Sequence, residues 1–118
     1  MKRRHMVVPL LNNEYKVIVC WGSLQLVKRL TKEWGHEHIA EAKDLESRRG
    51  VTFYSKDCHP IIALPRFPKT AAEIGTLAHE ATHAIVNVFE KIDERSYDEV
   101  FAHSIGAVVR VVLKEGRK

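Results

Sequence analysis

The chain has 118 residues, of which 45% are hydrophobic and 29% are charged, and its formal net charge is +4. This composition is typical of one small globular domain and excludes a disordered or fibrous chain. Because the basic residues are scattered along the chain rather than clustered, the positive charge does not favour nucleic-acid binding.

The first part of the chain predicts one strand followed by two helices. Residues 1–13 are expected to form a flexible arm. Residues 15–21 (YKVIVCW) are mostly β-branched, apolar or aromatic, which predicts a buried strand with Cys20 as a buried thiol. The apolar residues that follow recur at helical spacing up to Gly35, and the charged segment 39–48 predicts a second helix.

Two short apolar runs in the middle of the chain predict a β-hairpin. They cover residues 51–54 and 61–64 and are separated by turn-type residues. Pro60 and Pro65 flank the second run, which favours an edge position in a sheet. An edge strand beside the next helix could accept an extended peptide as one more strand.

Two capping-box patterns predict the last two helices. Thr70 and Glu73 mark the start of the first, which is expected to end near Lys91. The second pattern lies at residues 96–99 and opens a helix that is expected to run to about Leu113. The core stripe of the first of these helices is expected to comprise Ile74, Leu77, Ala78, Ala81, Ile85 and Val88.

Residues 79–83 of that helix read H-E-A-T-H and are the strongest functional signal in the chain. His79 and His83 are four residues apart, so both imidazoles lie on one helix face and can bind one metal ion. Glu80 lies beside the same ion and is free to act as a general base. This spacing indicates a zinc hydrolase, and the competing interpretation is a pair of histidines without metal.

Zinc hydrolases usually use three protein ligands, so a third ligand is expected from the last helix or the segment before it. The candidates are Glu94, Asp98, Glu99 and His103. Glu99 is preferred because a small-residue face at Ala102 and Gly106 would let its helix pack closely on the motif helix. Glu99 is also the residue that closes the capping box of Ser96, and this interpretation stays open.

Residues around the motif could support the chemistry. Thr76 and Asn87 are candidates to orient the imidazoles. The group that would stabilise an oxyanion is not identified by any motif, and its candidates are His103, Tyr54, His59 and Tyr97.

On these residues the chain resembles the zincin metallopeptidases, specifically the gluzincin arrangement. The resemblance rests on His79, Glu80 and His83, followed by Glu99 in the segment DEVFA. The longer stretch GVTFY…HPIIALP…EIGTLAHEATHA is similar to small metallopeptidase-like proteins of bacteriophages. The resemblance implies that His79, His83 and Glu99 bind Zn²⁺ and that Glu80 is the base. His103 differs from the aspartate that many gluzincins have four residues after the third ligand.

The expected fold is α+β: a minimal zincin-like domain over residues 1–118. A small mixed sheet would pack on the HExxH helix and on a C-terminal helix. The expected function is hydrolysis of peptide bonds in a peptide or protein substrate, through a metal-activated water with Glu80 as general base. Because the chain is short, a partner protein or a second copy could complete the cleft.

Two other functions stay open. One is a zinc-stabilised binding module without catalysis. The other is a DNA-associated zinc protease in which His103 is the third ligand. For the peptidase, as for these two alternatives, we expect a cytoplasmic protein, in the host cytoplasm if a phage encodes it. No apolar run approaches the roughly 20 residues of a membrane span, and the N-terminus lacks the apolar segment of a signal peptide.

Overall fold

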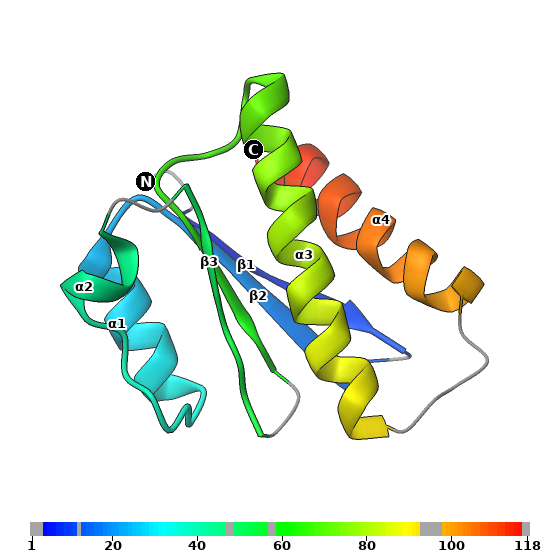
Figure 1. Cartoon of the computed structure of the whole chain (residues 1–118), viewed down its shortest axis with the longest axis horizontal. Helices are drawn as coiled ribbons and strands as arrows, with labels where there is room; N and C mark the ends of the chain where they lie inside the picture. Colours follow the sequence, from blue (N-terminus) through cyan, green and yellow to red (C-terminus); the bar gives the residue numbers. More distant parts are fainter. Residues whose placement is uncertain (1–3, 12, 47–48, 57–58, 93–97, 117–118) are drawn as a thin grey trace.

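The computed structural model describes residues 4–11, 13–46, 49–56, 59–92 and 98–116, and the side chains of residues 91–92 and 98–99 lie outside this description. The described residues form an α+β fold, with α3 and α4 on one face of a mixed sheet and α1 on the other (Figure 1). The predicted fold class, a small mixed sheet packed on the motif helix and a C-terminal helix, is confirmed. In chain order the elements are β1 (His5–Leu10), β2 (Tyr15–Trp21), α1 (Leu24–Glu33), α2 (Ala42–Leu45), β3 (Val51–Phe53), β4 (Ile61–Leu64), α3 (Ala71–Ile92) and α4 (Asp98–Glu115).

The strand order is β1-β2-β4-β3, with β2 and β4 parallel at the centre and an antiparallel strand at each edge. We predicted an edge position for residues 61–64, and this prediction was wrong. β4 lies inside the sheet because Pro60 and Pro65 fall outside its paired residues and remove no N–H from its ladders. The Pro60 carbonyl accepts a hydrogen bond from the Ile18 amide at 3.0 Å. The edge next to α3 is therefore β3.

β1 stands where we predicted a flexible arm over residues 1–13, so that prediction was wrong for its described part. β1 pairs antiparallel with β2 over its whole length. Its alternate residues Met6, Val8 and Leu10 are buried in the core beneath α3 and α4. Pro9 is tolerated, although it has no N–H to donate, because β1 is an edge strand.

β2 is buried on both faces, which accounts for its unbroken apolar run. Val17 and Val19 belong to the core beneath α3 and α4, whereas Ile18 and Cys20 belong to a second core beneath α1. Burial raises the pKa of the Cys20 thiol to about 12. The predicted buried thiol is thus confirmed, and Cys58 lies outside the described residues.

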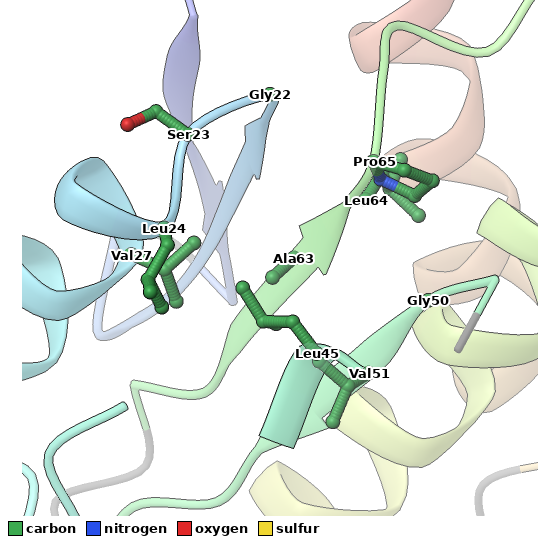
Figure 2. Close-up of a pocket in the computed structure, with 10 residues that line it drawn as sticks. All are labelled: Gly22, Ser23, Leu24, Val27, Leu45, Gly50, Val51, Ala63, Leu64 and Pro65. Carbon is green, nitrogen blue, oxygen red and sulfur yellow. The ribbon is translucent and has the colours of Figure 1, made fainter. Parts of the chain in front are cut away.

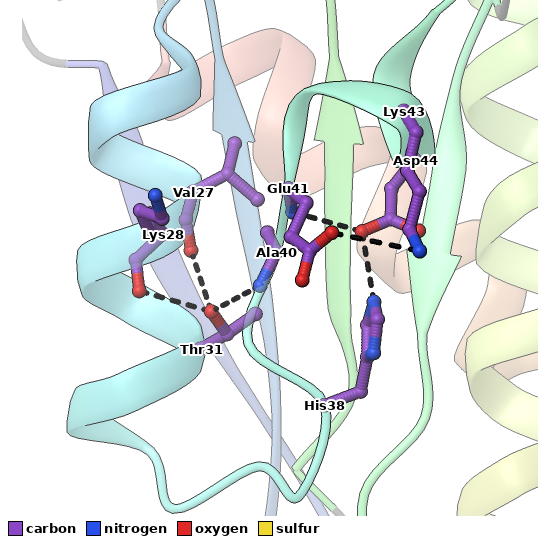
Figure 3. Close-up of polar contacts among 8 residues, drawn as sticks. All are labelled: Val27, Lys28, Thr31, His38, Ala40, Glu41, Lys43 and Asp44. Atoms are coloured by element: carbon purple, nitrogen blue, oxygen red, sulfur yellow. Dashed lines mark hydrogen bonds and ion pairs between the residues drawn. The ribbon is translucent and has the colours of Figure 1, made fainter.

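Of the helix predicted over residues 39–48, the described residues form only the single turn α2 (Figure 3). Its start is fixed by a capping box, in which the Asp44 carboxylate accepts a hydrogen bond from the Glu41 amide at 2.8 Å. The same carboxylate contacts His38 Nε2 at 2.8 Å. The hydrogen bond to His38, followed by that to Glu41, lowers the pKa of Asp44. The backbone returns to an extended conformation at Glu46, so the helix ends after one turn.

α3 begins at the predicted capping box. Thr70 Oγ1 accepts a hydrogen bond from the Glu73 amide at 3.1 Å, and Glu73 Oε1 accepts one from the Thr70 amide at 3.0 Å. The backbone bond to Thr70, followed by the bond to Arg66, lowers the pKa of Glu73 to about 2. The predicted core stripe faces the sheet, with Ile74 and Ala78 half-buried and four residues fully buried: Leu77, Ala81, Ile85 and Val88.

α4 packs against α3 through large apolar residues. The ring of Phe101 meets that of Phe89 edge-on, with centroids 5.4 Å apart, and Val108 and Val112 are buried in the shared core. α4 extends slightly past its predicted end near Leu113. No helix formed by the described residues is both long and apolar enough to cross a membrane.

Candidate metal centre

The outer face of α3 carries the two histidines of the H-E-A-T-H motif. His79 and His83 are exposed, and their Nε2 atoms lie 3.2 Å apart. The two rings are nearly perpendicular, with an interplanar angle of 82° and centroids separated by 4.8 Å. The four-residue spacing therefore brings two ring nitrogens to one point outside the helix.

The separation of these nitrogens fits one zinc ion. Zinc binds imidazole nitrogen at about 2.0–2.1 Å in tetrahedral geometry, which places two such nitrogens about 3.3 Å apart. The observed 3.2 Å agrees with that geometry. Without metal, the same distance is that of a hydrogen bond between the rings, with the proton on one Nε2. His79 and His83 could therefore hold one zinc ion between them in place of that proton.

Glu80 lies on the side of α3 that faces β3, and only 8% of it is exposed. Its Oε1 accepts a hydrogen bond from Thr52 Oγ1 at 2.7 Å, and the same hydroxyl lies 3.1 Å from the Glu80 carbonyl oxygen. Gly50 passes close to the same side chain, because a Cβ built at Gly50 would lie 3.2 Å from Glu80 Cγ. The carboxylate is therefore held between the motif helix and the edge strand.

Hollows open at both ends of β3, along its boundary with α3. The one before β3 has a volume of about 420 Å³ and is lined by Arg49, His79 and Glu80 among others. The one after β3 has a volume of about 580 Å³, and Tyr54 and Glu90 contribute to its walls. The motif thus lines the hollow before β3, through His79 and Glu80.

Among the oxyanion candidates, Tyr54 is exposed and lines the hollow after β3 together with Asn87 and Glu90. Burial, followed by the nearby carboxylates of Glu80 and Glu90, raises the pKa of the Tyr54 phenol. His59 faces elsewhere, since its Nδ1 accepts a hydrogen bond from a backbone amide of β2 at 3.3 Å. Tyr97 lies outside the described residues.

The described residues do not place a third ligand. Three of the four candidates have side chains outside the description: Glu94, Asp98 and Glu99. Among the side chains that are described, no group of three His, Cys, Asp or Glu is suited to a metal. Phe101, on the first turns of α4, packs against Phe89, which lies about 9 Å along the α3 axis beyond His83. The first turns of α4 therefore pack against the C-terminal part of α3. The role of Glu99 as third zinc ligand stays a prediction.

The small-residue face expected to pack on α3 lies elsewhere. Ala102 and His103 are exposed. Among the described side chains, a Cβ built at Gly106 would meet none of α3 within 4 Å, and its nearest neighbour would be Arg110 Nη1 of the same helix, at 3.7 Å. The packing prediction was wrong because larger side chains such as Phe101 form the interface instead.

The two residues predicted to orient the imidazoles bind other partners. Thr76 Oγ1 donates to the Ala72 carbonyl of its own helix at 3.1 Å. Asn87 Oδ1 accepts a hydrogen bond from the Ser55 amide at 3.1 Å and ties the end of β3 to α3. The sequence reasoning missed Thr52, for which the only available signal was a hydroxyl residue within an otherwise apolar strand.

A further pocket lies on the opposite face of the sheet and has a volume of about 210 Å³ (Figure 2). Val27 of α1, Leu45 of α2 and Ala63 of β4 line it, and Ser23 is a polar residue at its border. None of the described residues that line it is a histidine, cysteine, aspartate or glutamate. This pocket is therefore not part of the candidate metal centre.

Comparison of the chain with protein-family models, curated proteins and solved structures found no match in any of the three. The site is therefore defined by its own residues. A histidine pair with the spacing of zinc ligands lies beside a buried carboxylate, on the outer face of α3. Such an arrangement is suited to metal-assisted hydrolysis.

Proposed function

We propose that the protein is a zinc-dependent metallopeptidase that hydrolyses peptide bonds with Glu80 as general base. The observation that carries this proposal is the 3.2 Å separation of the Nε2 atoms of His79 and His83, beside the Glu80 carboxylate. All three side chains come from one helix, whose capping box and buried stripe fix its position on the sheet.

In this proposal each site residue has one role. His79, His83 and Glu99 would hold a zinc ion, which would supply Lewis acidity at the site. Glu80 takes a proton from the water and delivers it to the leaving amine as the peptide bond breaks. Tyr54, at the hollow after β3, would donate a hydrogen bond to the carbonyl oxygen as negative charge develops.

The edge strand supports a peptide as the substrate. Among the described strands β3 pairs only with β4, so its other side presents backbone donors and acceptors. An extended peptide that paired with this side would lie along the boundary between β3 and α3. The hollows at both ends of β3 would then receive side chains on either side of the scissile bond.

The exposure of both histidines leaves the proposed site open to solvent. A metallopeptidase needs to exclude water around the reacting bond, because electrostatic stabilisation is stronger in a dry site. We therefore propose that another molecule completes the active-site cleft. This molecule is a partner protein, a second copy of the chain or the substrate protein itself. The proposed place of action is the cytoplasm, or the host cytoplasm for a phage-encoded protein.

Zinc content is the first test. We expect near-stoichiometric zinc in wild-type protein purified without added metal, and its loss in His79→Ala and Glu99→Ala, measured by elemental analysis. His38→Ala is the matched control, because His38 is an exposed histidine paired with Asp44, away from the motif. Zinc lost in His79→Ala but kept in Glu99→Ala would move the third-ligand role to His103. A folded wild type that does not take up added zinc would contradict the proposal.

Turnover is the second test. We expect the zinc-loaded wild type to cleave a random-sequence mixture of quenched fluorescent peptides. Glu80→Gln should bind zinc and lose activity by about 10²- to 10⁴-fold, the usual contribution of a general base. Bound zinc with no turnover by the wild type would favour the binding module over the peptidase.

A further inference from the structure

The contact between Thr52 and Glu80 joins the edge strand to the proposed general base. Thr52 Oγ1 lies 2.7 Å from Glu80 Oε1, and both side chains are buried. From this geometry we infer that Thr52 is a positioning residue, which holds the Glu80 carboxylate in the orientation that proton transfer requires. The inference rests on the proposed peptidase function, and it assigns a role to a residue outside the H-E-A-T-H motif.

The geometry suits this role because the donor is fixed by the sheet, whereas the acceptor is at the end of a side chain with several rotatable bonds. Thr52 is paired with Ile62 inside the β3–β4 ladder, so its backbone position is set by the sheet. A glutamate side chain has three rotatable bonds, and ordering it costs conformational entropy. A hydrogen bond to a carboxylate is stronger than one between neutral groups, and therefore can hold such a side chain in one rotamer.

Because of this hydrogen bond, the two carboxylate oxygens of Glu80 have different roles. Oε1 is the oxygen bound to Thr52, and among the described residues no other side-chain partner of Glu80 is found. Oε2 is therefore the oxygen left to receive a proton from water. Glu80 lines the hollow before β3 together with His79, so water can reach the carboxylate from that side.

Gly50 has no side chain and therefore leaves room for the side chain of Glu80. Gly50 and Thr52 are two residues apart, so both face α3 across the same side of the chain. A Cβ at Gly50 would lie 3.2 Å from Glu80 Cγ and 3.0 Å from Thr76 Cγ2. The Thr52 hydroxyl thus binds the Glu80 carboxylate, and the space beside Gly50 accommodates the Glu80 side chain.

The first test uses metal-free protein and needs no activity. Thr52→Val keeps the shape of the side chain and removes the hydroxyl, and Glu80→Ala removes the acceptor. We expect the two changes to be coupled in urea denaturation by about tenfold in the unfolding equilibrium constant, as for a hydrogen bond to a charged group. Additive effects would show that the contact does not hold Glu80, and would overturn the inference.

The second test uses zinc-loaded protein and the peptide mixture described above. We expect Thr52→Val to bind zinc fully, to keep the wild-type KM and to lower kcat by about 10- to 100-fold, the effect of a misplaced catalytic group. Thr52→Ser restores the hydroxyl and should restore kcat. A hydroxyl needed only for folding would lower stability without this selective loss of kcat.

A matched control is available on the other side of the sheet. Thr31 is also buried, and its Oγ1 donates to the Lys28 carbonyl at 2.9 Å (Figure 3). Thr31→Val should lower stability and leave kcat unchanged. Wild-type kcat in Thr52→Val would overturn the positioning role alone. Zinc-loaded wild type without turnover would overturn the proposed function and, with it, this role of Thr52.

Discussion

Gly50 lies just before β3, where the backbone passes close to side chains of the motif helix. Gly50→Ala places a Cβ 3.0 Å from Thr76 Cγ2 and 3.2 Å from Glu80 Cγ, closer than these atoms tolerate without moving. We expect a loss of about 1–3 kcal/mol in the free energy of unfolding, typical of overpacking. Peptidase activity should fall as well, because Glu80 is displaced. Urea denaturation and the peptide assay measure the two effects.

Gly75 supplies the control for that prediction. It lies in α3 near the same hollow, and a Cβ at this position would meet nothing within 4 Å. Gly75→Ala should therefore stabilise the protein by about 0.5–1 kcal/mol through higher helix propensity. Equal destabilisation by both alanine variants would show that crowding at Gly50 is not the cause.

At this scale, the sequence was most informative where the residues of the site share one helix. His79, Glu80 and His83 could be grouped because helical periodicity fixes their relative directions. Thr52 could not be found in the same way, since its contact with Glu80 joins residues 28 positions apart and depends on how β3 packs on α3. The assignment of Glu99 depends on the relative placement of two helices, which spacing along the chain does not determine.

The start of α3 gives a pH-dependent prediction at the scale of an element. Hydrogen bonds from the Thr70 backbone and from Arg66 lower the pKa of Glu73 to about 2, from a usual value of 4.5. A lowered pKa in the folded state means that the charged form of Glu73 stabilises the fold above about pH 4.5. This contribution is lost as the pH falls through about 2.

Glu73→Gln should therefore lower the thermal unfolding midpoint near neutral pH, and the difference from wild type should shrink toward zero as the pH falls to about 2. Thermal denaturation monitored by circular dichroism measures both midpoints. Glu33→Gln is the control, because Glu33 is an exposed carboxylate whose pair with Arg29 spans 3.4 Å at the surface. A Glu73→Gln difference that stayed constant with pH would contradict the assignment to ionised Glu73.

The elements were predictable where a strong local signal marked them. The apolar run of β2 and the capping box of α3 gave their positions directly. β1 was missed because Pro9 interrupts its apolar residues, and its role as a strand depends on pairing with β2. The second helix was overestimated because its charged residues gave only a weak helical pattern, and the backbone becomes extended at Glu46 after one turn. Which strand forms the edge depends on the whole sheet.

The reactivity of the Cys20 thiol can be used to measure global unfolding of the protein. Its thiol is fully buried, burial raises its pKa to about 12, and its Sγ lies 3.5 Å from the Ile62 carbonyl oxygen. In a Cys58→Ser background we expect a thiol reagent at mildly alkaline pH to modify Cys20 only as the protein unfolds. The labelling rate should rise with urea in parallel with global unfolding. Rapid labelling under native conditions would contradict the buried position.

The parallel pairing of β2 with β4 has a consequence for folding kinetics. Cys20 and Ile62 meet across this pair although 42 residues separate them in the chain, so forming it closes a long loop. Closing such a loop costs entropy before the new contacts compensate, and non-local pairing slows folding. The β1–β2 hairpin and the segment from β3 through α3 each rely on nearer neighbours. We expect the joining of these two halves to limit the folding rate. His79 and His83 should be brought together when α3 forms, before that step.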